Sequence, residues 1–446
     1  MNDSWLVRDA RVVNEGRSFD ADVLVRNGTI ERVAPEGIGS VHGVHEIDAA
    51  GHLLLPGAID DQVHFREPGL THKDDLAHGS AAAVAGGITS FMEMPNTDPP
   101  AITQERLAHK YARAAAVSVA NHSFYMGVAN GNMDDVLRTD PRTVCGLKAF
   151  LGSSTGDLLV DDPRTLERLF REAHMILAVH AEHEPTIRAN MAAAKAKWGD
   201  AIPIAEHPRI RSADGCYRSS SWAVGMAREH GTRLHVLHIS TARELDLFDP
   251  GPLEGKRITA EACVHHLWFT EADHATKGAL IKWNPAVKTR NDRDAIRAAV
   301  IDGRIDVVAT DHAPHTLEEK SRPYAQCPSG GPLVQHALVA MLELVHEGVY
   351  TVEQVVEKMC HAPARLFKVH RRGFVREGHA ADLVLVDPQA PWVVTKENLL
   401  YKCGWSPFEG TRFRSRVLRT WVNGRSVFAD GRVDDAVRGE RLIFER

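Results

Sequence analysis

The sequence lacks the marks of a membrane or secreted protein. None of its apolar runs approaches the roughly 18 residues that cross a bilayer. The N-terminal stretch MNDSWLVRDARVV has no basic region followed by an apolar one, so we expect no secretory signal. The six cysteines are scattered without a C-x-x-C pair, which is typical of reduced thiols. These absences predict a cytoplasmic protein without a membrane partner.

The chain also lacks a strong excess of charge of either sign. Its 53 Lys and Arg residues face 59 Asp and Glu residues, and the net charge of −6 favours neither nucleic acid nor an anionic membrane as a partner. The remaining composition is ordinary for a soluble globular protein, with 43% hydrophobic and 25% charged residues. A length of 446 residues suits two or three domains.

The two ends of the chain share a pattern of short β-strands. Residues 1–52 contain alternating runs such as ADVLVRNGTIERVA, and residues 373–446 contain ADLVLVD and RVLRTWVNG. Period-2 alternation with Asn-Gly turns at 27–28 and 423–424 indicates antiparallel strands. We predict that the two ends form one small β-sandwich domain, and that residues 53–372 form a separate domain between them.

The middle of the chain alternates between apolar strands and helices. Helical stretches such as DLAHGSAAAVAG and TQERLAHKYARAAA separate the strand-like runs. This alternation indicates a parallel sheet that is buried on both faces. Eight such units make a (β/α)8 barrel, so we predict an α/β fold, a TIM-like barrel with a terminal β-sandwich. The eight runs lie at 53–64, 87–95, 119–128, 144–151, 175–181, 233–240, 257–265 and 305–311.

Polar residues stand where several of these predicted strands end. His64, His180, His238 and Asp311 belong to the ends of the first, fifth, sixth and eighth runs, and Lys148 lies inside the fourth. The strand ends of a closed barrel converge at its C-terminal face, where the active sites of such barrels lie. One histidine at a strand end is usually structural, but imidazole and carboxylate gathered together suit Zn²⁺. The joint pattern therefore predicts a metal site.

Lys148 requires its own explanation, because a lone buried ammonium is costly. One solution is a carboxylate partner that forms an ion pair with it. Another follows from its chemistry: a neutral lysine amine adds CO2 to give a carbamate, an anionic oxygen ligand that can bridge two cations. We expect this second solution beside a metal site.

Several motifs together resemble the amidohydrolase superfamily and, within it, the dihydroorotases. The resemblance extends over nearly the whole chain, and the set of motifs is far more specific than any one of them. The most specific segments are DDQVHFREPG (60–69), MPNT (94–97), GLKAF (146–150), VHAE (179–182), VLHIST (236–241), EACVHHL (261–267), KWNP (282–285), TDHAPH (310–315) and SGGP (329–332).

The resemblance implies roles for individual residues. His64 would bind the more buried of two metal ions, and His180 and His238 the more exposed one. Lys148 would be the carboxylated bridge, and Asp311 both a metal ligand and the general base. The resemblance also implies one or two Zn²⁺ ions and a homodimer. Residues implied in substrate binding are Arg66, Asn96, Asn284, His315 and Gly331.

Arg66 favours dihydroorotate as the small-molecule substrate. A guanidinium group makes bidentate contacts with a carboxylate, and dihydroorotate carries a carboxylate on its ring. Allantoin carries none, and the allantoinases have asparagine before E-P-G. The resemblance therefore implies the reversible, zinc-dependent hydrolysis of the cyclic amide of (S)-dihydroorotate to N-carbamoyl-L-aspartate in de novo pyrimidine (UMP) biosynthesis.

The sequence departs from the family at one metal-binding position. The usual D-x-H-x-H reads here as Asp60-Asp61-Gln62-Val63-His64, and an amide is a poorer zinc ligand than imidazole. Three outcomes stay open: Asp60 ligates in its place, only the more exposed ion binds, or the chain is a non-catalytic homologue that partners aspartate transcarbamoylase. A further alternative is another cyclic amidohydrolase, allantoinase-like or dihydropyrimidinase-like.

Overall fold

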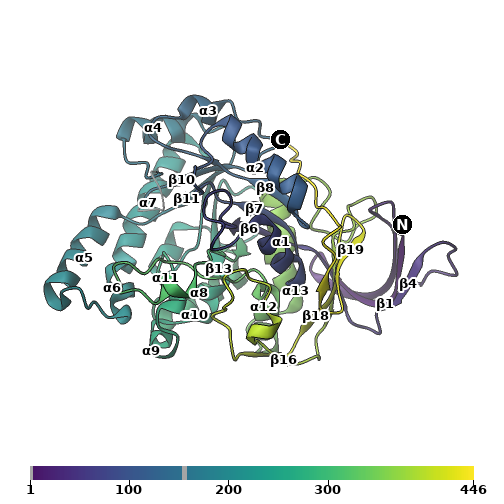
Figure 1. Ribbon diagram of the computed structural model, residues 1–446. Coiled ribbons are helices and arrows are strands. Elements are labelled where there is room, and N and C mark those ends of the chain that lie inside the picture. The colour runs from purple at the N-terminus through teal and green to yellow at the C-terminus, as the bar shows by residue number, and fades with distance from the viewer. Residues whose placement is uncertain (1–3, 153–157) are drawn as a thin grey trace.

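The computed structural model describes residues 4–152 and 158–446, in which a helix-covered barrel lies beside a bent β-sheet (Figure 1). The barrel strands are short and buried, as their apolar sequences predict, and neighbouring strands run parallel. Their bounds are β6 (Ala58–Val63), β7 (Ile88–Glu93), β8 (Asn121–Phe124), β9 (Met126–Gly127), β10 (Leu147–Phe150), β11 (Leu177–His180), β12 (Leu234–Val236), β13 (Ile258–Cys263) and β14 (Val307–Ala309).

The barrel closes between its first and last strands. Strands β6 to β8 are hydrogen-bonded in one sheet and β9 to β14 in another, and β8 and β9 are one strand interrupted at Tyr125. At the other seam, Val63 forms a parallel bridge with His312, and the His64 amide donates to the His312 carbonyl over 2.7 Å. The eight-stranded (β/α)8 barrel predicted from the sequence is thereby confirmed.

Helices cover the outside of the barrel (Figure 1). Local signals define where they begin: Thr103 caps α2 by accepting from the Arg106 amide, and Thr289 with Asp292 forms a capping box on α10. The helices are α1 (Leu76–Ala85), α2 (Gln104–Val117), α3 (Met133–Leu137), α4 (Pro163–Glu172), α5 (Glu184–Trp198), α6 (His207–Ile210), α7 (Ala213–His230), α8 (Val264–Trp268), α9 (His274–Lys277), α10 (Arg290–Asp302), α11 (Leu317–Lys320), α12 (Ala337–His346), α13 (Val352–Val356) and α14 (Ala362–Phe367).

Shorter helical turns occur between these elements. A π-helical turn at Glu357–His361 joins α13 to α14. The 3-10 turns are Ile204–Glu206, Arg243–Leu247, Glu271–Asp273, Gly278–Ile281 and Lys396–Asn398.

The two ends of the chain build one sheet of nine strands, in the order β20-β19-β18-β15-β5-β1-β2-β3 with β4 beside β1. It is a single continuous sheet bent around an apolar core that includes Val7, Val23, Leu383 and Trp421. Its strands are β1 (Trp5–Asn14), β2 (Arg17–Arg26), β3 (Thr29–Ala34), β4 (His45–Asp48), β5 (Leu53–Pro56), β15 (Leu383–Asp387), β18 (Arg416–Val422), β19 (Arg425–Ala429) and β20 (Arg432–Val433), and a separate pair is β16 (Trp392–Val393) with β17 (Arg412–Phe413).

The junctions between barrel and sheet differ from the sequence-based boundaries. The run predicted as the first barrel strand, 53–64, divides at Gly57: β5 pairs with β1 and β15 in the terminal sheet, and β6 enters the barrel. The division occurs where a side chain at position 57 would collide with Thr89, whose Oγ1 lies 2.1 Å from an ideal Cβ. The Pro56-Gly57 pair, a common turn signal, stands at this change of sheet, but the sequence-based prediction continued one strand across it.

The C-terminal residues also leave the terminal sheet and pack against the barrel. Arg441 bridges to His122 at the start of β8. The Arg446 guanidinium donates to the Cys145 and Phe367 carbonyls over 2.7 and 2.8 Å. Leu442 and Phe444 belong to an apolar cluster with barrel residues, so this tail, placed by the sequence in the β-sandwich, helps to close one end of the barrel.

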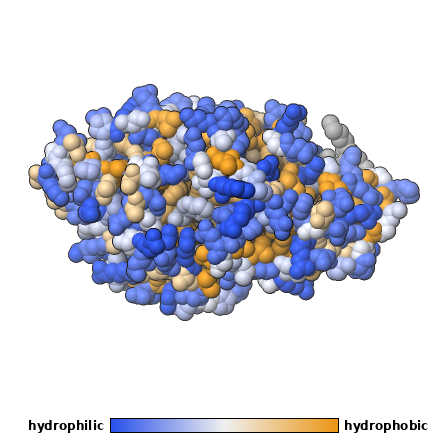
Figure 2. Space-filling view, turned by 90° about the horizontal axis from the view of Figure 1, so that it is seen from below, coloured by the Kyte–Doolittle hydropathy of each residue, from blue (hydrophilic) through white to orange (hydrophobic). Residues whose placement is uncertain are grey.

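The exterior visible in Figure 2 is mostly hydrophilic, and its hydrophobic areas are small and separated. In the described part of the chain, the large hydrophobic side chains that are exposed lie apart in sequence: Trp198, Trp222, Ile301, Leu317, Val393 and Ile443. No helix within residues 4–152 and 158–446 is long and apolar enough to cross a membrane.

Two tight turns, one from the N-terminal and one from the C-terminal part of the sheet, lie in contact with each other. Asn27-Gly28 connects β2 to β3 and Asn423-Gly424 connects β18 to β19, all four with positive φ, as predicted for two-residue Asn-Gly turns. The turns touch, because a Cβ on Gly424 would lie 2.7 Å from the Gly28 Cα.

Gly424→Ala should therefore lower the free energy of unfolding more than Gly16→Ala does. Both glycines have positive φ, which costs an alanine about 1–2 kcal/mol. Only Gly424 adds a collision, since nothing lies within 4 Å of a Cβ at Gly16. Urea unfolding of the two variants measures the difference, and equal losses would show that the packing of the two turns contributes nothing.

Candidate active site

The predicted site residues converge on one cavity at the C-terminal ends of the barrel strands. The cavity has a volume of about 270 Å³. Its wall includes Phe150, Trp283 and the backbone around Ser329 and Gly330, and its charged members are three cations and one carboxylate. Predicted residues that line it are His64, Arg66, Asn96, Lys148, His180, His238, Asn284, Asp311 and His315.

Two histidines and a lysine bring nitrogen atoms together in this cavity. Three of these atoms, His180 Nε2, His238 Nδ1 and Lys148 Nζ, have no hydrogen-bond partner within the described residues. His180 Nδ1 lies 2.9 Å from His238 Nε2, and His180 Nε2 lies 3.1 Å from the Glu182 carboxylate. The Nε2 atom has no hydrogen-bond partner within the described residues, although Glu182 lies close to it, and the Nδ1 atom faces His238. The Lys148 Nζ is buried and has no hydrogen-bond partner within the described residues. Nitrogen atoms that converge with so few partners fit a bound cation.

Burial sets the protonation of this group. Loss of water, followed by the charges of nearby groups, puts the pKa of His238 well below its usual value, and the pKa of His180 is lowered for the same first reason. Neutral imidazole is the form that ligates metals. Burial lowers the pKa of Lys148 to about 7, although Glu261 and Asp311 oppose the shift, so a neutral amine is accessible.

Glu182 and Arg211 support His180 from behind. The Arg211 guanidinium donates to the same Glu182 oxygen that lies 3.1 Å from His180 Nε2. Burial opposes ionisation of Glu182, but Arg211 and His180 outweigh it and hold its pKa well below the usual value. A carboxylate behind a ligand histidine fixes the ring's tautomer and orientation.

A second group of donors comes from the barrel seam. His64 Nε2 lies 3.2 Å from Asp311 Oδ1, and His64 Nδ1 lies 2.7 Å from the Asn96 carbonyl oxygen. The Nδ1–H donates to Asn96, which leaves the Nε2 lone pair facing a carboxylate. Burial raises the pKa of Asp311 to about 7, although His180, Lys148 and Arg66 oppose it. A cation between His64 and Asp311 would satisfy both atoms.

Gln62 replaces the usual metal-binding histidine, and Asp60 was the alternative ligand in its place. The two side chains have different surroundings. The Gln62 amide nitrogen donates to Asp311 Oδ1 over 3.3 Å, and its oxygen accepts from the Cys263 thiol over 3.5 Å. Asp60 accepts from the Thr310 hydroxyl over 2.6 Å and is not part of the cavity wall. Asp60 is thus engaged outside the cavity in this structure.

Arg66 gives one side of the cavity its positive charge and lies beside the His315 ring. The Arg66 Nε donates to the Pro314 carbonyl over 3.1 Å, and its Nη2 lies 3.1 Å from His315 Nε2. Lys73 lies 3.1 Å from His315 Nδ1, and His315 Nε2 lies 3.0 Å from the Ser329 carbonyl. Burial lowers the pKa of Arg66 to about 10, so it stays cationic at neutral pH.

The two remaining predicted residues differ in placement. Asn284 lines the cavity, and its Oδ1 is buried without a hydrogen-bond partner in the described chain. Gly331 lies behind the wall: its carbonyl accepts from the Ala313 amide over 3.0 Å, and an added Cβ would meet Trp283 at 2.7 Å. Ser329 and Gly330 of the same SGGP segment face the cavity instead.

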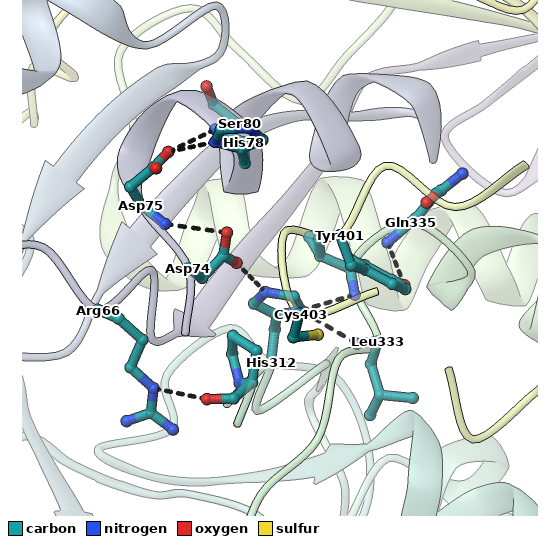
Figure 3. Close-up of polar contacts among 12 residues, drawn as sticks. Arg66, Asp74, Asp75, His78, Ser80, His312, Leu333, Gln335, Tyr401 and Cys403 are labelled. Atoms are coloured by element: carbon teal, nitrogen blue, oxygen red, sulfur yellow. Dashed lines mark hydrogen bonds and ion pairs between the residues drawn. The ribbon is translucent and has the colours of Figure 1, made fainter. Parts of the chain in front are cut away.

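Next to Asp311, the buried residues Asp74 and His312 form a hydrogen-bonded pair where the first and last barrel strands meet (Figure 3). His312 Nδ1 accepts from the Leu333 amide over 3.0 Å, so its Nε2 carries the proton and donates to Asp74 over 3.0 Å. The other Asp74 oxygen accepts from the Asp75 amide over 2.9 Å. The pair ties the start of α1 to the loop after β14, next to Asp311.

Asp74→Ala should lower the free energy of unfolding by about 2–4 kcal/mol, because two buried donors lose their acceptor. Asp74→Asn keeps one acceptor oxygen and should cost less than the alanine variant. Urea unfolding of both variants tests the order. If asparagine cost as much as alanine, the hydrogen bond to His312 would not be what Asp74 supplies.

Sequence reasoning missed several residues of the site. Arg211 lies in a polar segment with no pattern that points to the cavity, and only the fold brings it to Glu182. Phe150 and Trp283 belong to the segments GLKAF and KWNP, but aromatic residues in apolar runs are usually core. The position of Glu182, two residues after His180 in the sequence, was only a weak indication that it belongs to the site.

The sequence pattern of the amidohydrolase family matches residues 53–427, and the chain belongs to this family of hydrolases. Members of the family generally bind divalent metals, and the donors described above fit such ions. The cyclic amidohydrolases within it are the relatives of this chain.

Individual relatives carry different activities in their names. A dihydroorotase of Halobacterium salinarum is 36% identical over 87% of this chain and 90% of its own length. An allantoinase of Solibacter usitatus is 34% identical over 95% and 93%. The solved structure of an L-hydantoinase from Arthrobacter aurescens superimposes with a TM-score of 0.92 and 26% identity, covering 97% of this chain and 98% of that one.

Proposed function

We propose that this cyclic amidohydrolase is a dihydroorotase, which interconverts (S)-dihydroorotate and N-carbamoyl-L-aspartate in pyrimidine biosynthesis. The position of Arg66 carries the proposal. Its guanidinium is buried in the cavity wall, held at Nε by Pro314, and it leaves donors for a ligand carboxylate. Both dihydroorotate and carbamoyl-aspartate have such a carboxylate, and allantoin and dihydrouracil do not.

The balance of charge supports an anionic substrate. Arg66 and Arg211 line the cavity against the single carboxylate of Asp311, and Lys148 is left out of this balance because it is proposed below to carry an anionic carbamate. Burial keeps the pKa of the neighbouring histidines low, so those rings add no charge at neutral pH. A small cavity with an excess of fixed cations favours a small anion over a neutral ring.

The residues then have distinct tasks in the hydrolysis. A Zn²⁺ ion held by His180, His238 and Lys148 would lower the pKa of water and polarise the amide carbonyl. Asp311 accepts a proton from the attacking water and returns it to the ring nitrogen as the carbon–nitrogen bond breaks. Arg66, Asn96, Asn284 and His315 hold the substrate's carboxylate and carbonyl groups in place. Ring closure follows the same path with Asp311 protonated.

Lys148 would act as an anionic ligand after addition of CO2. Its amine is buried, its pKa is lowered to about 7 by that burial, and no carboxylate bonds to it in the described chain. Carboxylation converts an unpaired ammonium into a ligand whose charge the metal neutralises. This explains why a lysine can stand in an apolar strand here.

The comparisons leave one competing function, that of a cyclic amidohydrolase for neutral rings, since an allantoinase is about as similar as a dihydroorotase. A substrate panel of dihydroorotate, allantoin and dihydrouracil distinguishes the two. We expect turnover of dihydroorotate alone. Turnover of a neutral ring without turnover of dihydroorotate would replace the proposal with its competitor.

Arg66→Ala should reduce kcat/KM for dihydroorotate by about 100-fold, which corresponds to the about 1.5–3 kcal/mol of a charged hydrogen bond. Arg66→Lys should restore little, because an ammonium lacks the planar fork. Arg243→Ala, at an exposed position outside the cavity, is the matched control. An unchanged KM in Arg66→Ala would remove the argument for a carboxylate-bearing substrate.

We also propose that Gln62 weakens the metal position between His64 and Asp311, so that an ion at His180 and His238 is the more tightly held of the two. The Gln62 oxygen is engaged by Cys263, and its amide nitrogen points to Asp311. An N–H group cannot ligate a cation. His64 and Asp311 are thus one donor short compared with a histidine at position 62.

Gln62→His should add about one equivalent of zinc per chain relative to the wild-type protein, since three ligands are the usual minimum for a protein zinc site. Elemental analysis of protein purified without chelator measures it, with Gln62→Met as a control that adds no imidazole. Equal zinc in all three proteins would show that position 62 does not limit metal binding.

A further inference from the structure

A second cluster of metal-ligating side chains lies deeper in the barrel, apart from the cavity. Asp61 of β6, His235 of β12 and Glu261 of β13 are all fully buried, and none of them lines the cavity. The ring of Phe367 packs on His235 at 6.0 Å between centroids, so the cluster has an apolar neighbour. Two carboxylates and one imidazole in such surroundings need an explanation.

Hydrogen bonding fixes the proton on one side of the His235 ring. His235 Nδ1 lies 2.8 Å from the Thr259 hydroxyl oxygen, and that hydroxyl donates its own proton to the Leu234 carbonyl over 3.2 Å. The hydroxyl therefore accepts, and Nδ1 carries a hydrogen. In a neutral ring, the opposite nitrogen, Nε2, then presents a lone pair.

That lone pair would face two carboxylates. His235 Nε2 lies 3.3 Å from Asp61 Oδ2 and 3.7 Å from Glu261 Oε2. Three electron-rich atoms cannot converge in a dry interior unless something positive lies between them. Burial by itself lowers the pKa of His235, but the two carboxylates raise it to about 9. The charge is either a proton on Nε2 or a metal ion.

The distances favour a metal ion over a proton. Charge-assisted hydrogen bonds between nitrogen and a carboxylate measure about 2.7–2.9 Å, shorter than either contact here. Ligands about 2.1 Å from a tetrahedral ion are about 3.4 Å from one another, which lies between the two observed separations. In addition, neither Asp61 oxygen has a hydrogen-bond donor among the described residues, although both are fully buried.

We propose that Asp61, His235 and Glu261 hold a divalent first-row cation, zinc or manganese, beneath the active-site cavity. One neutral imidazole and two carboxylates balance a charge of +2 and offer ligands that suit these ions. The site is structural, because its ligands are enclosed and the cavity does not reach them.

Glu261 links this site to the candidate catalytic group. Its other oxygen accepts from the His238 amide over 3.1 Å and lies 3.4 Å from the Cys263 thiol, the same thiol that donates to Gln62. An ion at Asp61, His235 and Glu261 would thereby hold in place the strand ends that carry His238 and Gln62. The neighbouring group Cys263, His265 and His266 carries no similar proposal, since His265 stacks on Trp283 and His266 lies 3.0 Å from the Pro285 carbonyl.

The test is the metal that survives chelation. Wild-type protein expressed with zinc and manganese and dialysed against EDTA should lose the ion at the open cavity and retain about one equivalent per chain by elemental analysis. Asp61→Asn and Glu261→Gln, treated alike, should retain none. Asp60→Asn, which changes a buried aspartate of the same strand bonded to Thr310, is the matched control and should retain the ion.

The wild-type measurement decides the matter even if both variants fail to fold. No retained metal in the chelated wild-type protein would overturn the proposal and leave a protonated His235 as the source of charge, and equal retention in folded Asp61→Asn would overturn it as well. Expression with cobalt gives a second readout, in which a chelation-resistant visible absorption band is lost in the variants. None of these results depends on whether dihydroorotate is turned over.

Discussion

The closure of the barrel between β6 and β14 is the contact on which the site depends. One hydrogen bond, from the His64 amide to the His312 carbonyl, joins the strand that carries His64 and Arg66 to the strand that carries Asp311. The side chain of His312 then reaches Asp74 on one side and the Leu333 amide on the other. Residues about 250 positions apart in the chain become neighbours through this seam, which places His64, Arg66 and Asp311 beside one another.

The polar interior of the barrel is organised in two levels. Near the mouth, His64, Lys148, His180, His238 and Asp311 face the cavity. Below them, Asp61, His235 and Glu261 face one another in a dry core. At each level the side chains leave lone pairs or charges that they cannot satisfy among themselves, and burial makes such groups costly. Positive ions are the simplest partners for both levels, and Glu261 couples them through the His238 amide.

Sequence patterns predicted the barrel because its strands are continuous apolar runs separated by capped helices, and they predicted the Asn27-Gly28 and Asn423-Gly424 turns because only a few residue pairs form them. The strand-end residues could be assigned to one site because the geometry of a barrel brings the ends of its strands together. The division at Gly57 was missed because apolar residues flank the Pro56-Gly57 pair on both sides, and the prediction continued the strand across this turn signal. Arg211 and the Asp61 cluster were missed because their partners lie far away in sequence, and alternation gives a side chain's face but not its neighbours.

Three residues of the site, Arg66, His238 and Asp311, have positive φ angles of 66°, 40° and 47°. Residues with side chains hold this conformation at a cost, and asparagine is among those that tolerate it best. An exchange of Arg66 for asparagine would thus relax the backbone at this turn while removing the guanidinium. The main chain at this turn therefore raises no barrier to the loss of the arginine, and the charge of the cavity wall can change here without a change of fold.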